Sequence, residues 1–120
     1  MTTSISLSKY EKQVLPKYRD QLNQAESEED VKKFFVETVE RLLALATEDA
    51  VDPQYDDIRL VPGSPPYYQL TSQLLNCKAM QALANSDLQP ILHRIAEPAA
   101  HRYMHVAKHP EKTNAKIKGH

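Results

Sequence analysis

The chain has 120 residues, of which 41% are hydrophobic and 26% charged, a composition typical of a globular protein with one domain. Two glycines and one cysteine, Cys77, exclude collagen-like repeats, an intramolecular disulfide and a zinc site made of several thiolates. The formal charge of −1 conceals an asymmetry: residues 1–57 hold 7 basic and 13 acidic side chains, whereas residues 58–120 hold 8 basic and 3 acidic ones.

The first predicted helix spans residues 7–25. Ser6 is the expected N-cap, and Pro16 is expected to kink or break the helix because proline lacks a backbone donor. The spacing of the apolar and aromatic side chains by three or four residues is typical of a half-buried helix. These side chains are Leu7, Tyr10, Val14, Tyr18, Leu22 and Ala25.

The second predicted helix begins after Ser27 and has the clearest signals. Ser27 and Asp30 resemble a capping box, and three acidic residues fill the first turn, where the helix dipole favours negative charge. Its apolar face is wide enough to place the helix at the centre of the core, with Phe35 and Leu42 as anchors. The extra width at Val36 and Leu43 predicts self-association as a homodimer.

Residues 48–66 are predicted to form a long loop between the second and third helices. Ile58 and its neighbours to residue 61 can form a short extended piece, but one strand cannot make a sheet alone. The loop carries four carboxylates, which are ligands of hard cations, but their spacing matches no calcium-binding loop. A solvated loop is therefore the favoured interpretation of Asp49, Asp52, Asp56 and Asp57.

A third helix is predicted over residues 67–84, after a start at Pro65 and Pro66, and a fourth over residues 88–108. Pro98 is expected to kink the fourth helix. Four amphipathic helices without an alternating strand pattern predict an all-α single domain, residues 1–108, that resembles a four-helix bundle. Residues 109–120 are polar and basic and are predicted to be a flexible tail.

The most distinctive polar pattern lies on the fourth helix, where four histidines and one glutamate follow one another at steps of four. Side chains at this spacing share a helix face, and pairs of them can bind zinc or nickel. Glu97, His101 and His105 are therefore the candidate metal ligands. They lie opposite the apolar stripe, and no cysteine or second histidine cluster completes a site, so a solvated face is favoured.

Three other sequence features are weaker indications of function. The residues from Pro65 to Tyr68 fit the PPxY pattern that aromatic grooves recognise, although a helix start explains them as well. Cys77 falls on the predicted inner face, where a thiol behaves as a small hydrophobic group. The basic tail can add contacts to phosphates but lacks interleaved aromatic residues.

No catalytic motif accompanies these patterns, so we expect a non-enzymatic, cytoplasmic protein that acts in protein interaction or as a structural domain. The cytoplasmic location is expected because residues 1–10 have no apolar signal-peptide core and the longest apolar stretch has five residues, 42–46. A metal-binding protein that uses the His/Glu stripe is one alternative. A weak nucleic-acid-binding accessory protein is the other, although nucleic acid and membrane are not the expected partners.

Overall fold

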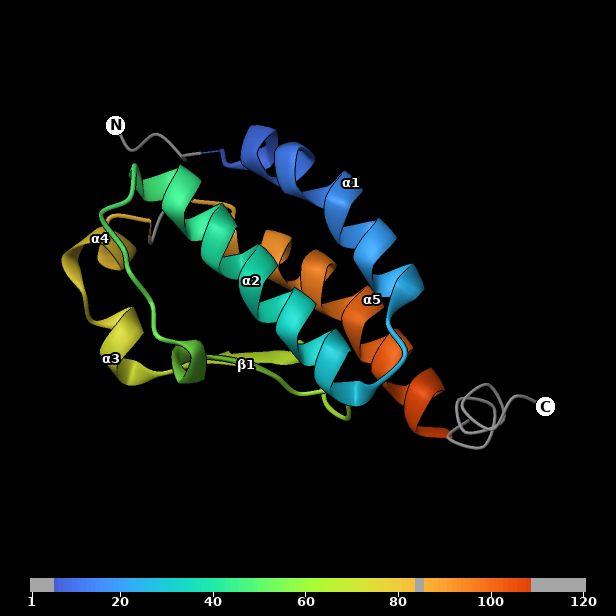
Figure 1. Ribbon diagram of the computed structural model, residues 1–120. Helices are drawn as coiled ribbons and strands as arrows, with labels where there is room; N and C mark the ends of the chain where they lie inside the picture. The colour runs from blue at the N-terminus through green and yellow to red at the C-terminus, as the bar shows by residue number, and fades with distance from the viewer. Residues whose placement is uncertain (1–5, 84–85, 109–120) are drawn as a thin grey trace.

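The computed structural model describes residues 6–83 and 86–108, which are mostly helical (Figure 1). Three long helices are α1 (Ser8–Gln24), α2 (Glu28–Thr47) and α5 (Leu88–Lys108). Between α2 and α5 the chain forms, in order, the 3₁₀ turn η1 (Tyr55–Asp57), strands β1 (Ile58–Leu60) and β2 (Tyr68–Leu70), and the single-turn helices α3 (Ser72–Leu75) and α4 (Lys78–Gln81).

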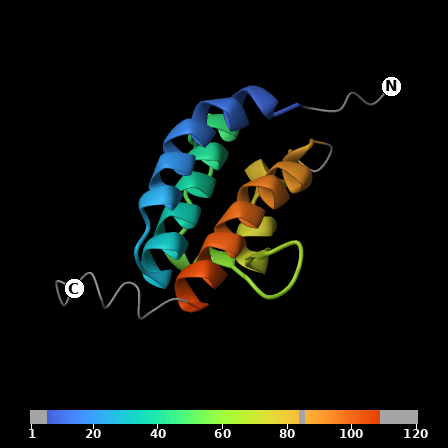
Figure 2. The same cartoon turned by 90° about the vertical axis from the view of Figure 1, so that its right-hand side faces the viewer.

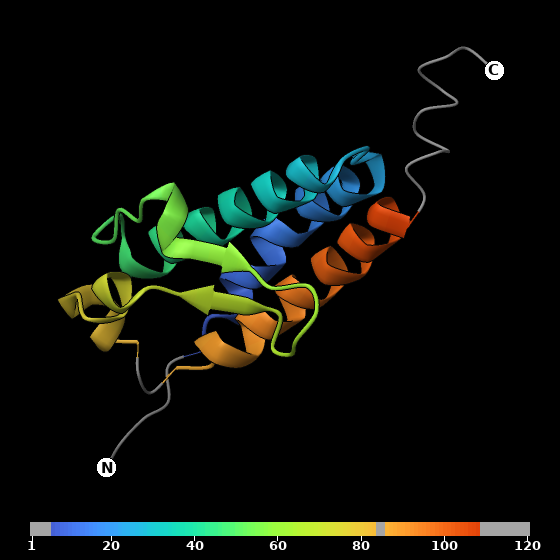
Figure 3. The ribbon, with the colours of Figure 1, turned by 90° about the horizontal axis from the view of Figure 1, so that it is seen from below.

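The three long helices pack against one another, and the hairpin of β1 and β2 packs on α2 and α5. Helices α1 and α5 run in the same direction, while α2 runs opposite to both (Figures 1 and 2). Seen from below, the two strands lie across α2 and α5, away from α1 (Figure 3). The molecule is therefore layered, with α1 on one side of the α2–α5 pair and the hairpin on the other.

The predicted third helix, residues 67–84, is wrong, and with it the four-helix bundle. Residues 68–70 instead pair with β1 in antiparallel register, which matches Ile58 with Leu70 and Leu60 with Tyr68. The hydroxyl of Thr71 then accepts a hydrogen bond from the backbone N–H of Leu74, 3.3 Å away, and caps α3. Because this cap fixes the helix start at Ser72, the apolar residues before it belong to a strand.

Of the two predicted N-cap residues, Ser27 is confirmed and Ser6 is wrong. The hydroxyl of Ser27 accepts a hydrogen bond from the N–H of Asp30 at 3.1 Å, so the cap of α2 is confirmed. Ser6 does not cap α1, because the N-cap position is Leu7. The N–H of Leu7 instead donates to a carboxylate oxygen of Asp87 at 2.7 Å, which ties the start of α1 to the start of α5.

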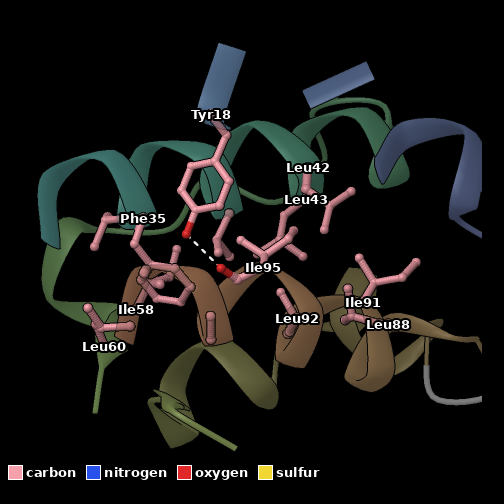
Figure 4. Packing of buried hydrophobic residues seen from close by; sticks show 14 of the residues in the cluster. Tyr18, Phe35, Leu42, Leu43, Ile58, Leu60, Leu88, Ile91, Leu92 and Ile95 are labelled. Atoms are coloured by element: carbon pink, nitrogen blue, oxygen red, sulfur yellow. Dashed lines mark hydrogen bonds between the residues drawn. The ribbon is translucent and has the colours of Figure 1, made fainter. Parts of the chain in front are cut away.

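A single cluster of apolar side chains joins all three layers (Figure 4). Phe35 and Leu42 are fully buried in it, which confirms their place in the core. Val36 and Leu43 are also buried within the chain, and β1 contributes the buried Ile58 to the same cluster. The wide face of α2 is thus covered by the chain itself, so it no longer provides a reason to expect a homodimer.

Both α1 and α5 continue as single helices through Pro16 and Pro98, so neither proline breaks its helix. The kink expected at each proline stays a prediction. Between the two helices, the buried hydroxyl of Tyr18 donates a hydrogen bond to the carbonyl oxygen of Ile95 at 2.6 Å (Figure 4). Burial raises the pKa of this phenol well above its ordinary value, because the ionised form would lose its hydration.

Alkaline pH should destabilise the protein through Tyr18. Below about pH 10 the phenol is protonated in both the folded and unfolded states, and its contribution to stability is complete. As the pH rises further, only the unfolded state loses the proton, so the free energy of unfolding falls by up to about 1.4 kcal/mol per pH unit. Urea titrations between pH 8 and pH 11 should show this decline, and Tyr18→Phe should reduce its slope. An unchanged slope in the variant would contradict the assignment.

Candidate functional site

The His/Glu stripe of α5 is partly covered instead of being a fully solvated face. The ring of Tyr67, from the loop before β2, lies 5.8 Å from the ring of His93 and 6.3 Å from that of His101. Nε2 of His93 lies 4.0 Å from a carboxylate oxygen of Glu97, one turn further along α5. The tyrosine thus bridges two turns of the stripe, a contact that helical spacing alone could not reveal.

The structure divides the three candidate metal ligands between two surroundings. His101 and His105 line an open groove of about 530 Å³ between α1 and α5, while Glu97 does not line it. The other residues of this groove, which we call the α1–α5 groove, are Arg19, Leu22, Asn23, Pro98 and Arg102. Within residues 6–83 and 86–108, no three His, Cys, Asp or Glu side chains are grouped so that they could hold a metal ion.

Arg102 gives the α1–α5 groove a fixed positive charge. Its Nη2 donates hydrogen bonds to the carbonyl oxygens of Ala25 at 2.7 Å and Asn23 at 3.3 Å. These carbonyls lie at the C-terminal end of α1, where the helix dipole attracts a cation. Nε of Arg102 is buried and has no hydrogen-bond partner in the described part of the chain. The guanidinium is therefore held in place with part of its bonding capacity unused.

A second surface, which we call the β2 groove, is not predicted by any pattern in the sequence. It encloses about 480 Å³ between β2, the two short helices and the start of α5. Leu75 on its wall is 47% exposed. None of the described residues that line it is Lys, Arg, Asp or Glu; they are Pro66, Tyr68, Gln69, Leu70, Leu75, Met80, Gln81, Leu83, Ser86, Leu88, Gln89, Pro90 and Leu92.

The outer edge of β2 contributes backbone groups to the β2 groove. The N–H of Thr71 donates to the carbonyl of Asp57 at 3.0 Å, and that of Val61 donates to Tyr67 at 2.8 Å. Antiparallel strands alternate between residues that bond to the partner strand and residues that point away from it. In this register the N–H and C=O groups of Tyr68 and Leu70 are directed away from β1, on the strand that lines the groove.

The acidic loop has a structural role at one of its four carboxylates. One oxygen of Asp57 accepts a hydrogen bond from the hydroxyl of Thr71 at 2.6 Å, and the other accepts one from the N–H of Gln54 at 2.9 Å. These two bonds, the Thr71 bond first, lower the pKa of the Asp57 carboxyl. Asp57 thus joins η1 to the residue that follows β2.

The PPxY pattern, Cys77 and the basic tail are the weaker motifs of the sequence, and the structure places the first two outside the helices. Pro65 and Pro66 are exposed in the turn between the strands and do not start a helix. Tyr68 of the PPxY pattern is half-buried in β2. Cys77 precedes α4, half-buried against the core. The basic tail, residues 109–120, lies outside the described residues.

No helix in the described ranges has the length and apolar character needed to cross a membrane. Comparison of the chain with known protein families, with characterised proteins and with solved structures finds no match.

Proposed function

We propose that this chain is a protein-interaction domain that binds an extended, apolar peptide segment of a partner protein in the β2 groove. The observation that carries the proposal is the coincidence of an apolar groove with the outward-facing edge of a strand. Peptides that add a strand to a sheet gain affinity from main-chain hydrogen bonds and specificity from alternate side chains in pockets.

The lining of the β2 groove supports an apolar occupant. Among residues 6–83 and 86–108 no charged side chain lines it, so a charged peptide would lose hydration without gaining an ion pair there. The exposed side chain of Leu75 would gain the most from being covered, at roughly 25 cal/mol per Å² of buried apolar area. Tyr68 and Leu70 would offer one N–H and one C=O each to the incoming strand.

The homodimer, the cytoplasmic location and the metal site expected from the sequence relate to this proposal in different ways. A second copy of the chain, as a homodimer, is an alternative occupant of the same groove, to be recognised by light scattering. A cytoplasmic setting is part of the proposal, because Cys77 has no second cysteine with which to form a disulfide. Zinc or nickel at Glu97, His101 and His105 is not supported by the arrangement, since two arginines share the groove with the two histidines.

The test of this proposal is a peptide selection followed by mapping on the protein. Ten-residue peptides selected from a display library should alternate apolar side chains, and their binding should shift the amide resonances of Tyr68 and Leu70. Leu75→Glu should weaken this binding by about tenfold or more, since it places a charge in an apolar groove. Met104→Glu, which alters another exposed apolar residue on α5, is the matched control and should leave binding unchanged.

Backbone chemistry separates strand addition from simple burial. Methylation of alternate peptide nitrogens should abolish binding when it falls on the nitrogens that face β2, and have little effect on the others. Selected peptides that are charged, that bind both glutamate variants equally, or that tolerate methylation everywhere would contradict the proposal.

A further inference from the structure

We propose that the α1–α5 groove binds a small organic phosphate ester. This site is separate from the β2 groove, with which it shares no lining residue, and is independent of the proposed function. The described side chains that meet there include two arginines and two histidines, and none of them is Asp or Glu.

The charges of the α1–α5 groove come from both helices. Arg19 is an exposed residue of α1, and Arg102 and His101 project from α5. Arginine carries a permanent charge, and its planar N–H fork matches the geometry of phosphate oxygens. Two guanidinium groups in one groove therefore favour a dianion over a metal cation, which they would repel.

Arg102 is pre-positioned for such a ligand. Its Nη2 is fixed by the two carbonyls at the end of α1, so little side-chain entropy remains to be lost on binding. The donors on Nη1 take part in none of these bonds, and the buried Nε has no partner in the described part of the chain. Unpaired buried donors are rare in folded proteins, and Arg102 therefore has hydrogen-bonding capacity left over.

The size and walls of the groove indicate the rest of the ligand. A volume of about 530 Å³ falls in the range of small-molecule sites, roughly 300–1,000 Å³, and greatly exceeds a phosphate ion. Leu22 and Pro98 provide apolar wall on which an organic group can pack. None of the described lining residues is Phe, Tyr or Trp, so they provide no stacking platform of the kind that binds single-stranded nucleic acid.

The experiment uses the full chain and phenyl phosphate as the probe, followed by amide chemical shifts. Inorganic phosphate, benzoate and phenol are the comparison probes. Phenyl phosphate should bind tightest and shift the amides of Arg19, Asn23, His101 and Arg102. Arg19→Gln should weaken it by about tenfold, the usual scale of one hydrogen bond to a charged group. Lys17→Gln removes the same charge from α1 outside this groove and should change affinity by less than about twofold.

Four results would overturn the proposal. The first is the absence of saturable shifts with phenyl phosphate, and the second is an equal loss in the two glutamine variants. The third is binding of benzoate as tight as that of phenyl phosphate, which would make the site a general anion site. The fourth is the reverse preference: zinc, or a twelve-residue single-stranded oligonucleotide, shifts the groove amides while phenyl phosphate does not.

Discussion

Replacing Phe35 by alanine should lower the free energy of unfolding by about 3–5 kcal/mol, the range for large-to-small changes in a packed core. Phe35 is among the largest fully buried side chains. It lies where α2 meets the hairpin, near Ile58 and Leu60 (Figure 4). Its removal would leave a cavity shared by two layers, which backbone movement in one layer cannot close.

The neighbouring Phe34 provides a matched control for Phe35. It is the same residue type on the same turn of α2, but only partly buried. Phe34→Ala should therefore cost less than half as much as Phe35→Ala. Urea denaturation monitored by circular dichroism would give both values, and equal losses would show that α2 is rotated relative to this description.

The second large effect is expected at the ion pair between α1 and α5. The two carboxylate oxygens of Glu11 each lie 2.9 Å from a donor of Arg94, Nε or Nη2. Arg94→Ala should cost about 1–3 kcal/mol, because the Glu11 side chain is only 10% exposed and would lose its partner. The figure is below that of a fully buried pair because the Arg94 side chain is 53% exposed.

The two halves of this pair should respond unequally. The hydrogen bonds that the Arg94 guanidinium donates to the Glu11 carboxylate raise the already high pKa of Arg94 further, so the arginine stays charged. Glu11→Gln leaves that charge free to be hydrated and should cost less than Arg94→Ala. Arg41→Ala, at an exposed arginine of α2, should change stability by no more than about 0.5 kcal/mol. A larger loss for Glu11→Gln than for Arg94→Ala would contradict this account.

The helices that could be predicted are those that carry local stop and start signals. α5 runs over residues 88–108, as its periodicity and the preceding turn predict, and α2 begins after the Ser27 cap. In both helices most of the buried side chains belong to the apolar stripe, although the polar Thr38 of α2 is also buried. Local periodicity succeeds here because each helix is long enough to present a complete face to the core.

The hairpin could not be predicted because its two strands depend on each other. The sequence predicts an extended piece at residues 58–61 but offers no partner strand for it. The partner, residues 68–70, also fits a helix, because Tyr67, Leu70 and Leu74 are spaced by three and four residues. Each strand has three residues, too few to show an alternating pattern. The decisive contacts, between Asp57 and Thr71, join residues 14 positions apart.

The candidate sites also depend on residues that lie far apart in the sequence, which local patterns cannot bring together. Spacing alone identified His101 and His105, because residues four apart share a helix face. It could not supply Arg19, which reaches them only because α1 and α5 lie side by side. The β2 groove gave no signal at all, since its walls come from a strand, two single-turn helices and a helix end.

The parallel course of α1 and α5 has a consequence for the order of folding. Their polar contacts, which include Leu7–Asp87, Glu11–Arg94, Tyr18–Ile95 and Ala25–Arg102, join residues 77 to 83 positions apart. Helices α1 and α2, in contrast, are neighbours in sequence and can pair after closing a very short loop, at far lower entropic cost. An α1–α2 hairpin should thus form early, and α5 should dock later. Weakening the α1–α5 contacts would then mainly accelerate unfolding and leave the folding rate almost unchanged.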